Sequence, residues 1–150
     1  MDAIDLTILT RLAVDGRASY TDLAEQIGLS APSTADRVRR LEERGVVRGY
    51  TARLDPESLG MGLTAFIFVR LEGAADPKAF LAALAGLPEI VECHHVAGDD
   101  DYLLKVHVAG TRGLESFISE HLKSLPGIAR TRSTVVLSSA IERPLTPREQ

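Results

Sequence analysis

Apolar residues recur at every third or fourth position through the first 45 residues of the chain, and this period predicts helices. The first helix carries an apolar stripe made of Ile4, Ile8 and Leu12, and it ends at Asp15-Gly16. The run Ser19 to Asp22 has the residue types of a capping box and predicts the start of a short second helix that ends at Gly28. Only Gly28-Leu29 precedes the next helix, which is the spacing of a helix-turn-helix.

The third helix, within Leu29 to Gly45, has a predicted start and end. Ser30 is a typical N-cap, Pro32 is tolerated in a first helical turn, and Gly45 is typical of the position after a helix. At about 100° per residue the apolar arc comprises Ala31, Thr34, Ala35, Val38 and Leu41. A second arc comprises Ser33, Arg37, Arg40 and Arg44. Such a cationic arc is either a solvated face or a binding face for an anion.

The chain changes character after the third helix. The run Val46 to Ala52 is β-like and predicts a wing or linker strand, and Gly60-Met61-Gly62 marks a domain boundary. We therefore expect a winged helix-turn-helix domain over residues 1–50 and a linker over 51–62. A second domain over residues 63–140 and a loose C-terminal tail over 141–150 complete the predicted organisation.

The second domain shows the alternation typical of β-structure. Strands are predicted at 63–71, 90–96, 102–108 and 128–137, with helices beginning at Asp76-Pro77 and at about Thr111. The pattern Leu-x-x-Leu-Pro-x-Ile occurs at Leu84 and again at Leu122, 38 residues later. The order βαββαβ indicates an α+β ferredoxin-like fold with two helices on one sheet face. Because Phe66 and Phe68 lie on the other face, we expect the chain to associate with itself there.

Composition fits an ordinary globular chain, with 45% hydrophobic and 25% charged residues. The N-terminus is acidic and no apolar run is long enough for a membrane span, so we expect a cytoplasmic protein without a membrane partner. The single cysteine, Cys93, excludes an internal disulfide and is expected to be a small buried residue.

The net charge of −4 argues at first against nucleic acid, but the charge is unevenly distributed. Residues 1–53 carry eight Arg and eight acidic residues, whereas residues 54–150 carry nine basic and thirteen acidic residues. From Ser30 to Arg53, six Arg stand against three acidic residues. Taken with the helix-turn-helix spacing, this local excess predicts a face that binds double-stranded DNA, formed by Ser30, Ser33, Thr34, Arg37, Arg39, Arg40 and Arg44.

Five motifs in order along the chain are similar to those of the Lrp/AsnC, or feast/famine, transcriptional regulators. They are Asp-Gly-Arg (15–17), Leu-Ala-Glu-Gln-Ile-Gly-Leu-Ser (23–30), Arg-Val-Arg-Arg-Leu-Glu (37–42), Gly-Tyr-Thr-Ala (49–52) and Val-Ala-Gly-Asp-Asp-Asp-Tyr-Leu-Leu-Lys (96–105). The resemblance covers nearly the whole chain. It implies a DNA-binding regulator that forms dimers, with further assembly up to an octamer, and that responds to a small effector, usually an amino acid.

The resemblance also implies an effector site at the turn Gly98 to Tyr102. Backbone amides in such a turn can receive a carboxylate, and an aspartate can hold an α-ammonium group. The expected effector residues are Gly98, Asp99, Asp101 and Tyr102, together with Thr111, Thr134, Val135 and Val136 by position. On residue chemistry alone the simpler interpretation is an acidic hairpin turn. Three adjacent aspartates cannot all point inward, so neither a metal site nor a cofactor is expected.

Catalysis has little support in the sequence. His94 and His95 are neighbours on one strand and point to opposite faces, while His107 and His121 lie in other elements. No catalytic Ser or phosphate-loop motif is present, so we do not expect an enzyme. Two alternatives remain open. Siroheme decarboxylases have a similar two-domain chain with histidine and arginine around a tetrapyrrole, and a scaffold whose helix-turn-helix only mediates association is also possible.

Overall fold

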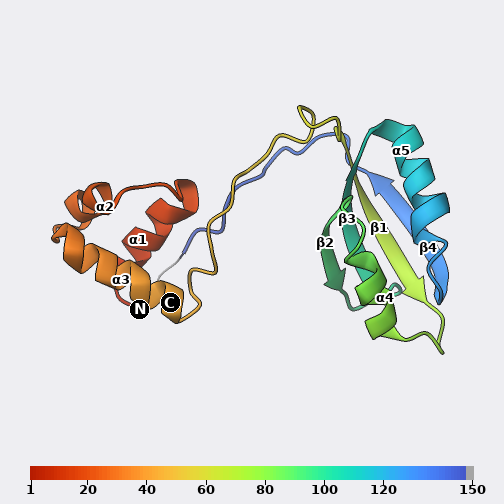
Figure 1. Cartoon of the computed structure of the whole chain (residues 1–150), viewed down its shortest axis with the longest axis horizontal. Coiled ribbons are helices and arrows are strands. Elements are labelled where there is room, and N and C mark those ends of the chain that lie inside the picture. Colours follow the sequence, from red (N-terminus) through yellow and green to blue (C-terminus); the bar gives the residue numbers. More distant parts are fainter. Residues whose placement is uncertain (148–150) are drawn as a thin grey trace. The chain divides into compact units, whose positions relative to one another are not determined.

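The computed structural model describes residues 1–147 (Figure 1). The chain forms two compact units: Met1–Arg53 together with the segment that starts at Ala140, and Leu54–Ser139. Of the linker expected over residues 51–62, residues 51–53 thus lie with the first unit and 54–62 with the second, and the described part of the expected tail lies with the first. Residues 148–150 of that tail are outside the described part. No helix in residues 1–147 is long and apolar enough to cross a membrane.

The N-terminal unit contains the three predicted helices, α1 (Ala3–Val14), α2 (Tyr20–Ile27) and α3 (Ala31–Glu43). Their ends follow the capping chemistry of the sequence. Ser19 and Asp22 form a capping box, Gly28 adopts a left-handed conformation with φ 67°, and the Ser30 hydroxyl accepts from the Ser33 amide. The core between the helices is small and fully buried, and consists of Ile8, Leu23, Val38 and Leu41.

The expected wing strand at Val46 to Ala52 is absent, because no strand lies between Glu43 and Leu63. This prediction is wrong for a physical reason: a strand needs a neighbouring strand to pair its backbone amides, and no described strand pairs with this segment. The segment is instead held by several contacts with the helices. The Val46 and Val47 amides donate to the Leu41 carbonyl, Val47 packs against the helical core, and the Tyr50 hydroxyl donates to Glu42 Oε1 at 2.8 Å. Burial and this carboxylate raise the pKa of Tyr50 to about 12.

The second unit confirms the predicted βαββαβ order. Its elements are β1 (Leu63–Leu71), α4 (Pro77–Leu84), β2 (Ile90–His95), β3 (Tyr102–Val108), α5 (Gly110–Ser116), the π-helical η1 (Phe117–Leu122) and β4 (Ile128–Val135). The four strands are antiparallel in the order β2-β3-β1-β4. The predicted second helix is therefore an α-helix continued by a π-helical turn, in which the Lys123 amide donates to the Ile118 carbonyl.

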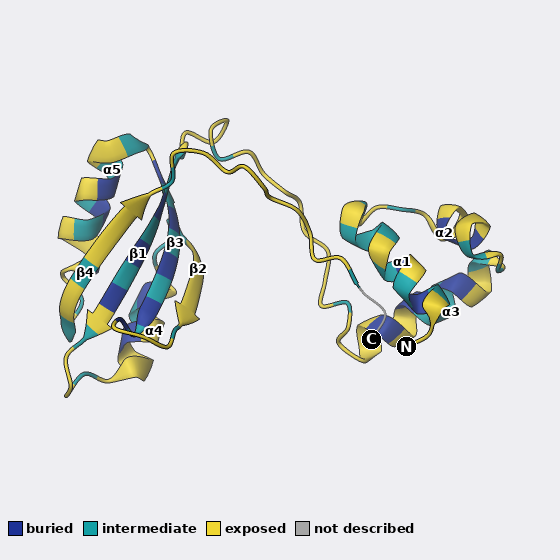
Figure 2. Cartoon of the chain, turned by 180° about the vertical axis from the view of Figure 1, so that it is seen from behind, coloured by how far each residue is buried: buried dark blue, intermediate teal, exposed yellow. Residues whose placement is uncertain are grey.

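The helices of this unit cover one face of the sheet (Figures 1 and 2). Alternation along β1 and β3 sends one set of side chains into this layer, where Ala65, Ile67, Val69, Leu104 and Val106 are fully buried. On the opposite face Phe66 and Phe68 are half-buried, and the Arg132 guanidinium lies 4.0 Å from the centre of the Phe68 ring. The prediction for Cys93 is wrong: it is exposed because β2 is an edge strand.

Candidate DNA-binding face and effector turn

Most of the predicted polar arc of α3 is exposed to solvent. Ser33, Arg40 and Arg44 are exposed. The hydroxyl of Ser30 donates to Ser33 Oγ at 2.9 Å, so both serines stand at the open N-terminal end of the helix. The helix thus presents hydroxyls at its start and arginines further along, which are groups that bind phosphates and base edges.

Most of the α3 arginines are ion-paired. Arg40 Nη2 lies 2.6 Å from Asp36 Oδ2, and Arg39 bonds both Asp36 and Glu43. The guanidiniums hold the pKa of Asp36 below its ordinary value, with the hydrogen bond from Arg39 as the largest cause. In residues 1–147, Arg44 is the one arginine of α3 without a carboxylate partner.

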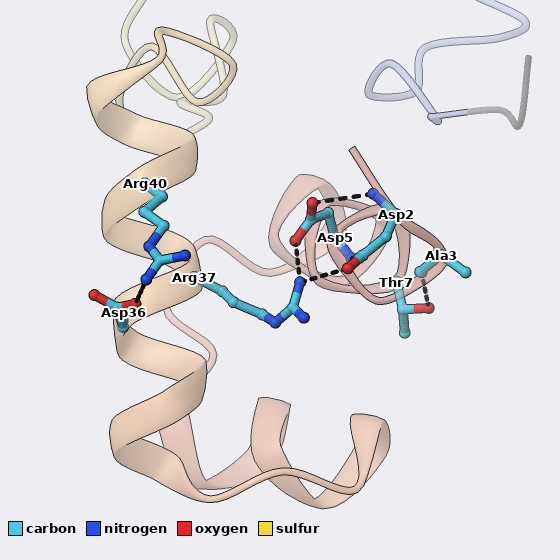
Figure 3. Close-up of polar contacts among 7 residues, drawn as sticks. All are labelled: Asp2, Ala3, Asp5, Thr7, Asp36, Arg37 and Arg40. Atoms are coloured by element: carbon cyan, nitrogen blue, oxygen red, sulfur yellow. Dashed lines mark hydrogen bonds and ion pairs between the residues drawn. The ribbon is translucent and has the colours of Figure 1, made fainter.

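Arg37 forms ion pairs with two carboxylates at the start of another helix (Figure 3). Its Nη1 donates to Asp2 Oδ2 and to Asp5 Oδ1, each at 2.8 Å, and so links α3 to the start of α1. The other oxygens of the two carboxylates form the capping box of α1, in which Asp5 N donates to Asp2 Oδ1 at 2.8 Å and Asp2 N donates to Asp5 Oδ2 at 3.1 Å. The pKa of Asp2 is lowered, first by the Asp5 amide and then by Arg37.

Two predicted DNA-binding residues lie elsewhere. Thr34 is fully buried and its hydroxyl donates to the Ser30 carbonyl at 3.0 Å, so the prediction that it reaches DNA is wrong. The reason is its place on the apolar arc of the helix, where a threonine methyl packs and the hydroxyl bonds the preceding turn. Arg39 is exposed but is about 200° round the helix from Arg37, so it flanks the face.

The acidic turn of the second unit is tightly held by backbone and side-chain bonds. Gly98 has φ 141°, a conformation that side chains disfavour. The Asp101 amide donates to the Val69 carbonyl at 2.9 Å, and Asp101 Oδ2 accepts from the Leu71 amide at 2.7 Å. Tyr102 is buried against Phe80, with 5.1 Å between ring centres. A depression of about 550 Å³ beside the turn is lined in part by Arg70, His95, Asp101 and Tyr102.

Asp100 is not among the expected effector residues, and its side chain is only 6% exposed. Its two oxygens accept from Arg130 Nη2 at 3.0 Å and from Arg132 Nη2 at 3.2 Å. Arg70 Nη1 also donates to the Asp99 carbonyl at 3.2 Å. Three arginines of β1 and β4 thus clamp the turn. The spacing of Arg130 and Arg132 places both on one strand face, but nothing in the sequence identifies Asp100 as their partner.

One chain does not bring all predicted effector residues together. Gly98, Asp99, Asp101 and Tyr102 lie at one end of β3, whereas Thr111 follows its other end, about 20 Å away for a strand of this length. Val135 pairs with Ala65 and the Val136 amide donates to Thr64, so both also lie towards the far end. Thr134 pairs with Phe66 in mid-sheet.

Comparison with known proteins decides the family. The family model of the AsnC-type helix-turn-helix domain matches residues 1–42, and that of the Lrp/AsnC ligand binding domain matches residues 64–146. The chain belongs to the Lrp/AsnC family. It is 40% identical to the HTH-type transcriptional regulator LrpA of Mycobacterium tuberculosis over 93% of this chain and 91% of that protein. It is 44% identical to the leucine-responsive regulatory protein of Salmonella typhimurium over 91% and 85% of the two chains.

Solved structures of Lrp/AsnC proteins agree with this fold. A transcriptional regulator from Neisseria meningitidis in complex with L-methionine has a TM-score of 0.92 at 33% identity, over 99% of this chain and 96% of that chain. The feast or famine regulatory protein of M. tuberculosis complexed with L-methionine has a TM-score of 0.89 at 39% identity, over 97% and 99% of the two chains. The resemblance seen in the five sequence motifs is therefore confirmed.

The histidines of this Lrp/AsnC chain have ordinary structural contacts. His94 Nε2 lies 3.1 Å from Glu92, His107 Nδ1 lies 3.0 Å from the Thr64 hydroxyl, and His95 packs against Tyr102. In residues 1–147 no three His, Cys, Asp or Glu side chains are grouped so as to hold a metal ion.

Proposed function

We propose that the chain is a transcriptional regulator that binds double-stranded DNA through α3 and responds to an amino acid at the acidic turn. The observation that carries this proposal is the exposed face of α3, where Ser33, Arg40 and Arg44 stand on a helix capped at both ends within an AsnC-type helix-turn-helix. Phosphates would be contacted by the arginines, and the hydroxyls would lie near base edges.

The DNA-binding face that we propose is smaller than the one expected from the sequence. Ser30, Ser33, Arg37, Arg40 and Arg44 remain in the face, with Ser30 acting mainly as the cap of α3. Arg39 and Thr34 are left out because one flanks the face and the other is buried. Arg44 has no competing carboxylate in residues 1–147, so it contributes its charge undiminished.

Two copies would join through the sheet face that the helices leave uncovered. Phe66 and Phe68 are half-buried there, next to half-buried Leu103 on β3. Burial of such a face removes apolar area from water, at about 25 cal/mol for each Å². A dimer with two-fold symmetry would present two α3 helices to a palindromic operator, with half-sites separated by one helical turn or a multiple of it.

An amino-acid effector would bind at the turn Gly98 to Tyr102, and residues from the far end of the sheet would come from a second copy. The relatives crystallised with L-methionine support this choice of ligand class. Asp101 lines the depression, and its Oδ1 accepts no hydrogen bond from the described chain, so we propose this oxygen as the group that holds the α-ammonium.

The DNA-binding proposal is tested with the full chain and a labelled duplex of the region upstream of its own gene. We expect affinity to fall steeply with added salt, because bound arginines release counterions from phosphates. A chain that retards no DNA at any salt concentration would contradict the proposal and favour the scaffold alternative.

The effector proposal is tested by the melting temperature of the chain with L-methionine and with L-leucine. A bound ligand raises the melting temperature, and Asp101→Ala should remove this rise. Glu25→Ala is the matched control, because it also removes one carboxylate but from an exposed position on α2, in the other unit. An identical response in Asp101→Ala would exclude Asp101 from the site.

A non-enzymatic role follows from the same proposal, since the relatives named above are regulators. No contact among the described histidines favours the siroheme decarboxylase alternative. His94 and His95 share β2 but contact different partners, Glu92 and Tyr102, and His107 and His121 lie in β3 and η1. Absorbance after addition of siroheme distinguishes the two. A stable haem-like spectrum would contradict the regulator proposal.

A further inference from the structure

Arg37 is the arginine of α3 whose guanidinium is anchored from another helix. Its contacts with Asp2 and Asp5 span 35 and 32 residues of sequence, whereas Arg39 and Arg40 pair only with carboxylates of α3 itself. The Arg37 side chain is 30% exposed, so part of it still reaches solvent.

The two carboxylates use every oxygen in this arrangement. Each gives one oxygen to the capping box of α1 and the other to Arg37 Nη1. The capping box fixes the carboxylates relative to the α1 backbone, and they in turn fix Nη1. The guanidinium is planar, so fixing one nitrogen by two bonds also fixes the plane and the direction of the remaining N–H groups.

The remaining edge of the guanidinium is open. Nε and Nη2 have no acceptor among residues 1–147, and Figure 3 shows them pointing away from Asp2 and Asp5. Together they carry three N–H donors, in the geometry that grips two oxygens of a phosphate. Arg37 lies on the same arc as Ser33, Arg40 and Arg44, at the exposed side of α3.

We propose that Asp2 and Asp5 are positioning residues for a phosphate contact of Arg37: they lock its Nη1 and aim its Nε–Nη2 edge at one DNA phosphate. This inference rests on the proposed DNA-binding function of α3. The net charge of the cluster formed by Asp2, Asp5 and Arg37 distinguishes positioning from a purely electrostatic effect. Because two carboxylates stand against one guanidinium, simple electrostatics predicts that removing a carboxylate strengthens DNA binding, whereas positioning predicts that it weakens binding.

The experiment measures binding of the full chain to a mixed-sequence duplex by fluorescence anisotropy at several salt concentrations. Phosphate contacts do not depend on sequence, so this probe suffices. We expect Asp5→Asn and Asp2→Asn each to weaken DNA binding. For Asp5→Asn the affinity should fall about tenfold, which corresponds to the loss of one charge-assisted hydrogen bond. Arg37→Gln should weaken binding and reduce the salt slope by about 0.9 for each phosphate that the variant no longer binds.

Arg37→Lys tests whether weaker binding merely reflects loss of folding. Lysine keeps the positive charge between the two carboxylates but has no Nε–Nη2 edge to bind a phosphate. It should bind as weakly as Arg37→Gln. Arg11→Gln is the matched control, since Arg11 lies on α1 and pairs with Asp15, the C-cap residue of that helix, at 3.1 Å. In the double variant Asp5→Asn/Arg37→Gln, the weakening should not exceed that of Arg37→Gln alone.

Other outcomes overturn the inference. Tighter binding by Asp5→Asn would show that the carboxylates mask Arg37. An unchanged salt slope in Arg37→Gln, or normal binding by Arg37→Lys, would show that Arg37 only joins two helices. If the unaltered chain shows no salt-dependent binding, the regulator proposal fails as well, so the two failures are distinguishable.

Discussion

Asp100 Oδ1 accepts a hydrogen bond from Arg130 Nη2 at 3.0 Å and thereby ties the acidic turn to β4. The carboxylate is nearly buried, and its second oxygen is held by Arg132. The turn is thus part of the folded sheet and is not a loosely solvated acidic loop. Removal of this carboxylate should therefore reduce the stability of the second unit.

The first prediction concerns Asp100→Asn, which should unfold at lower temperature than the unaltered chain at neutral pH. The hydrogen bond from Arg130, followed by that from Arg132, holds the pKa of Asp100 below its ordinary value of 3.8. A carboxyl with a lowered native pKa stabilises the fold fully above its unfolded pKa, and this stability is lost as the pH falls through the native pKa. The difference between the two proteins should therefore vanish in acid.

Thermal unfolding from neutral pH down to below pH 4 checks this prediction, with the range set by the ordinary Asp100 value of 3.8. Asp99→Asn is the matched control, because Asp99 is exposed and its side chain has no hydrogen bond in the described chain. A difference for Asp100→Asn that stays constant with pH would mean that the two arginine bonds do not stabilise the carboxylate form.

The second prediction is that Gly98→Ala lowers the free energy of unfolding of the second unit by about 1 to 3 kcal/mol. Gly98 has φ 141°, which an alanine rarely adopts, although no atom would clash with the added methyl group. Gly73→Ala is the control, since Gly73 has an equally open surrounding and an ordinary φ. Urea unfolding of both variants measures the effect, and equal stabilities would show that the turn relaxes without strain.

Local patterns in the sequence were enough to predict most of the fold. Strands at 63–71 and 102–108 coincide with β1 and β3 because alternation of apolar residues continues over their whole length. The helix starts at Ser19 and Ser30 were also predicted, since capping depends on residues within one turn.

The features that the sequence did not predict depend on distant partners. The Asp2–Arg37 pair spans 35 residues, and the Asp100–Arg132 pair spans 32, so neither leaves a local pattern. The wing at Val46 to Ala52 failed for the opposite reason: its residues favour a strand, but no neighbouring strand pairs with them. Residue type and position were enough to locate the candidate site residues. Whether each side chain is free to bind a ligand depends on long-range contacts, which the sequence does not reveal.

The third prediction tests self-association through the open sheet face. Phe66→Glu places a charge beside Phe68 in the centre of that face, which should prevent its burial against a second copy and yield monomers in sedimentation velocity. Leu81→Glu is the matched control, because Leu81 is 42% exposed on α4, on the other layer of the unit. Dissociation by Leu81→Glu but not by Phe66→Glu would place the interface on the helices.

The fourth prediction separates the binding face of α3 from its flank. Arg40→Gln combined with Arg44→Gln should lower the slope of log affinity against log salt concentration by about 0.9 for each phosphate that is no longer bound. The melting temperature should change little, because Arg44 has no ion pair in residues 1–147 and the Arg40–Asp36 pair is largely exposed.

Arg39→Gln supplies the comparison for this prediction, as it removes one positive charge from the same helix but from its flank. Its ion pairs with Asp36 and Glu43 are exposed, so the variant should fold normally. We expect its salt slope to stay close to that of the unaltered chain, measured by anisotropy with the same duplex. Because the double variant removes two charges and Arg39→Gln removes one, a slope reduced half as much by Arg39→Gln would show that DNA binding depends on the total charge of α3 and not on one face of it.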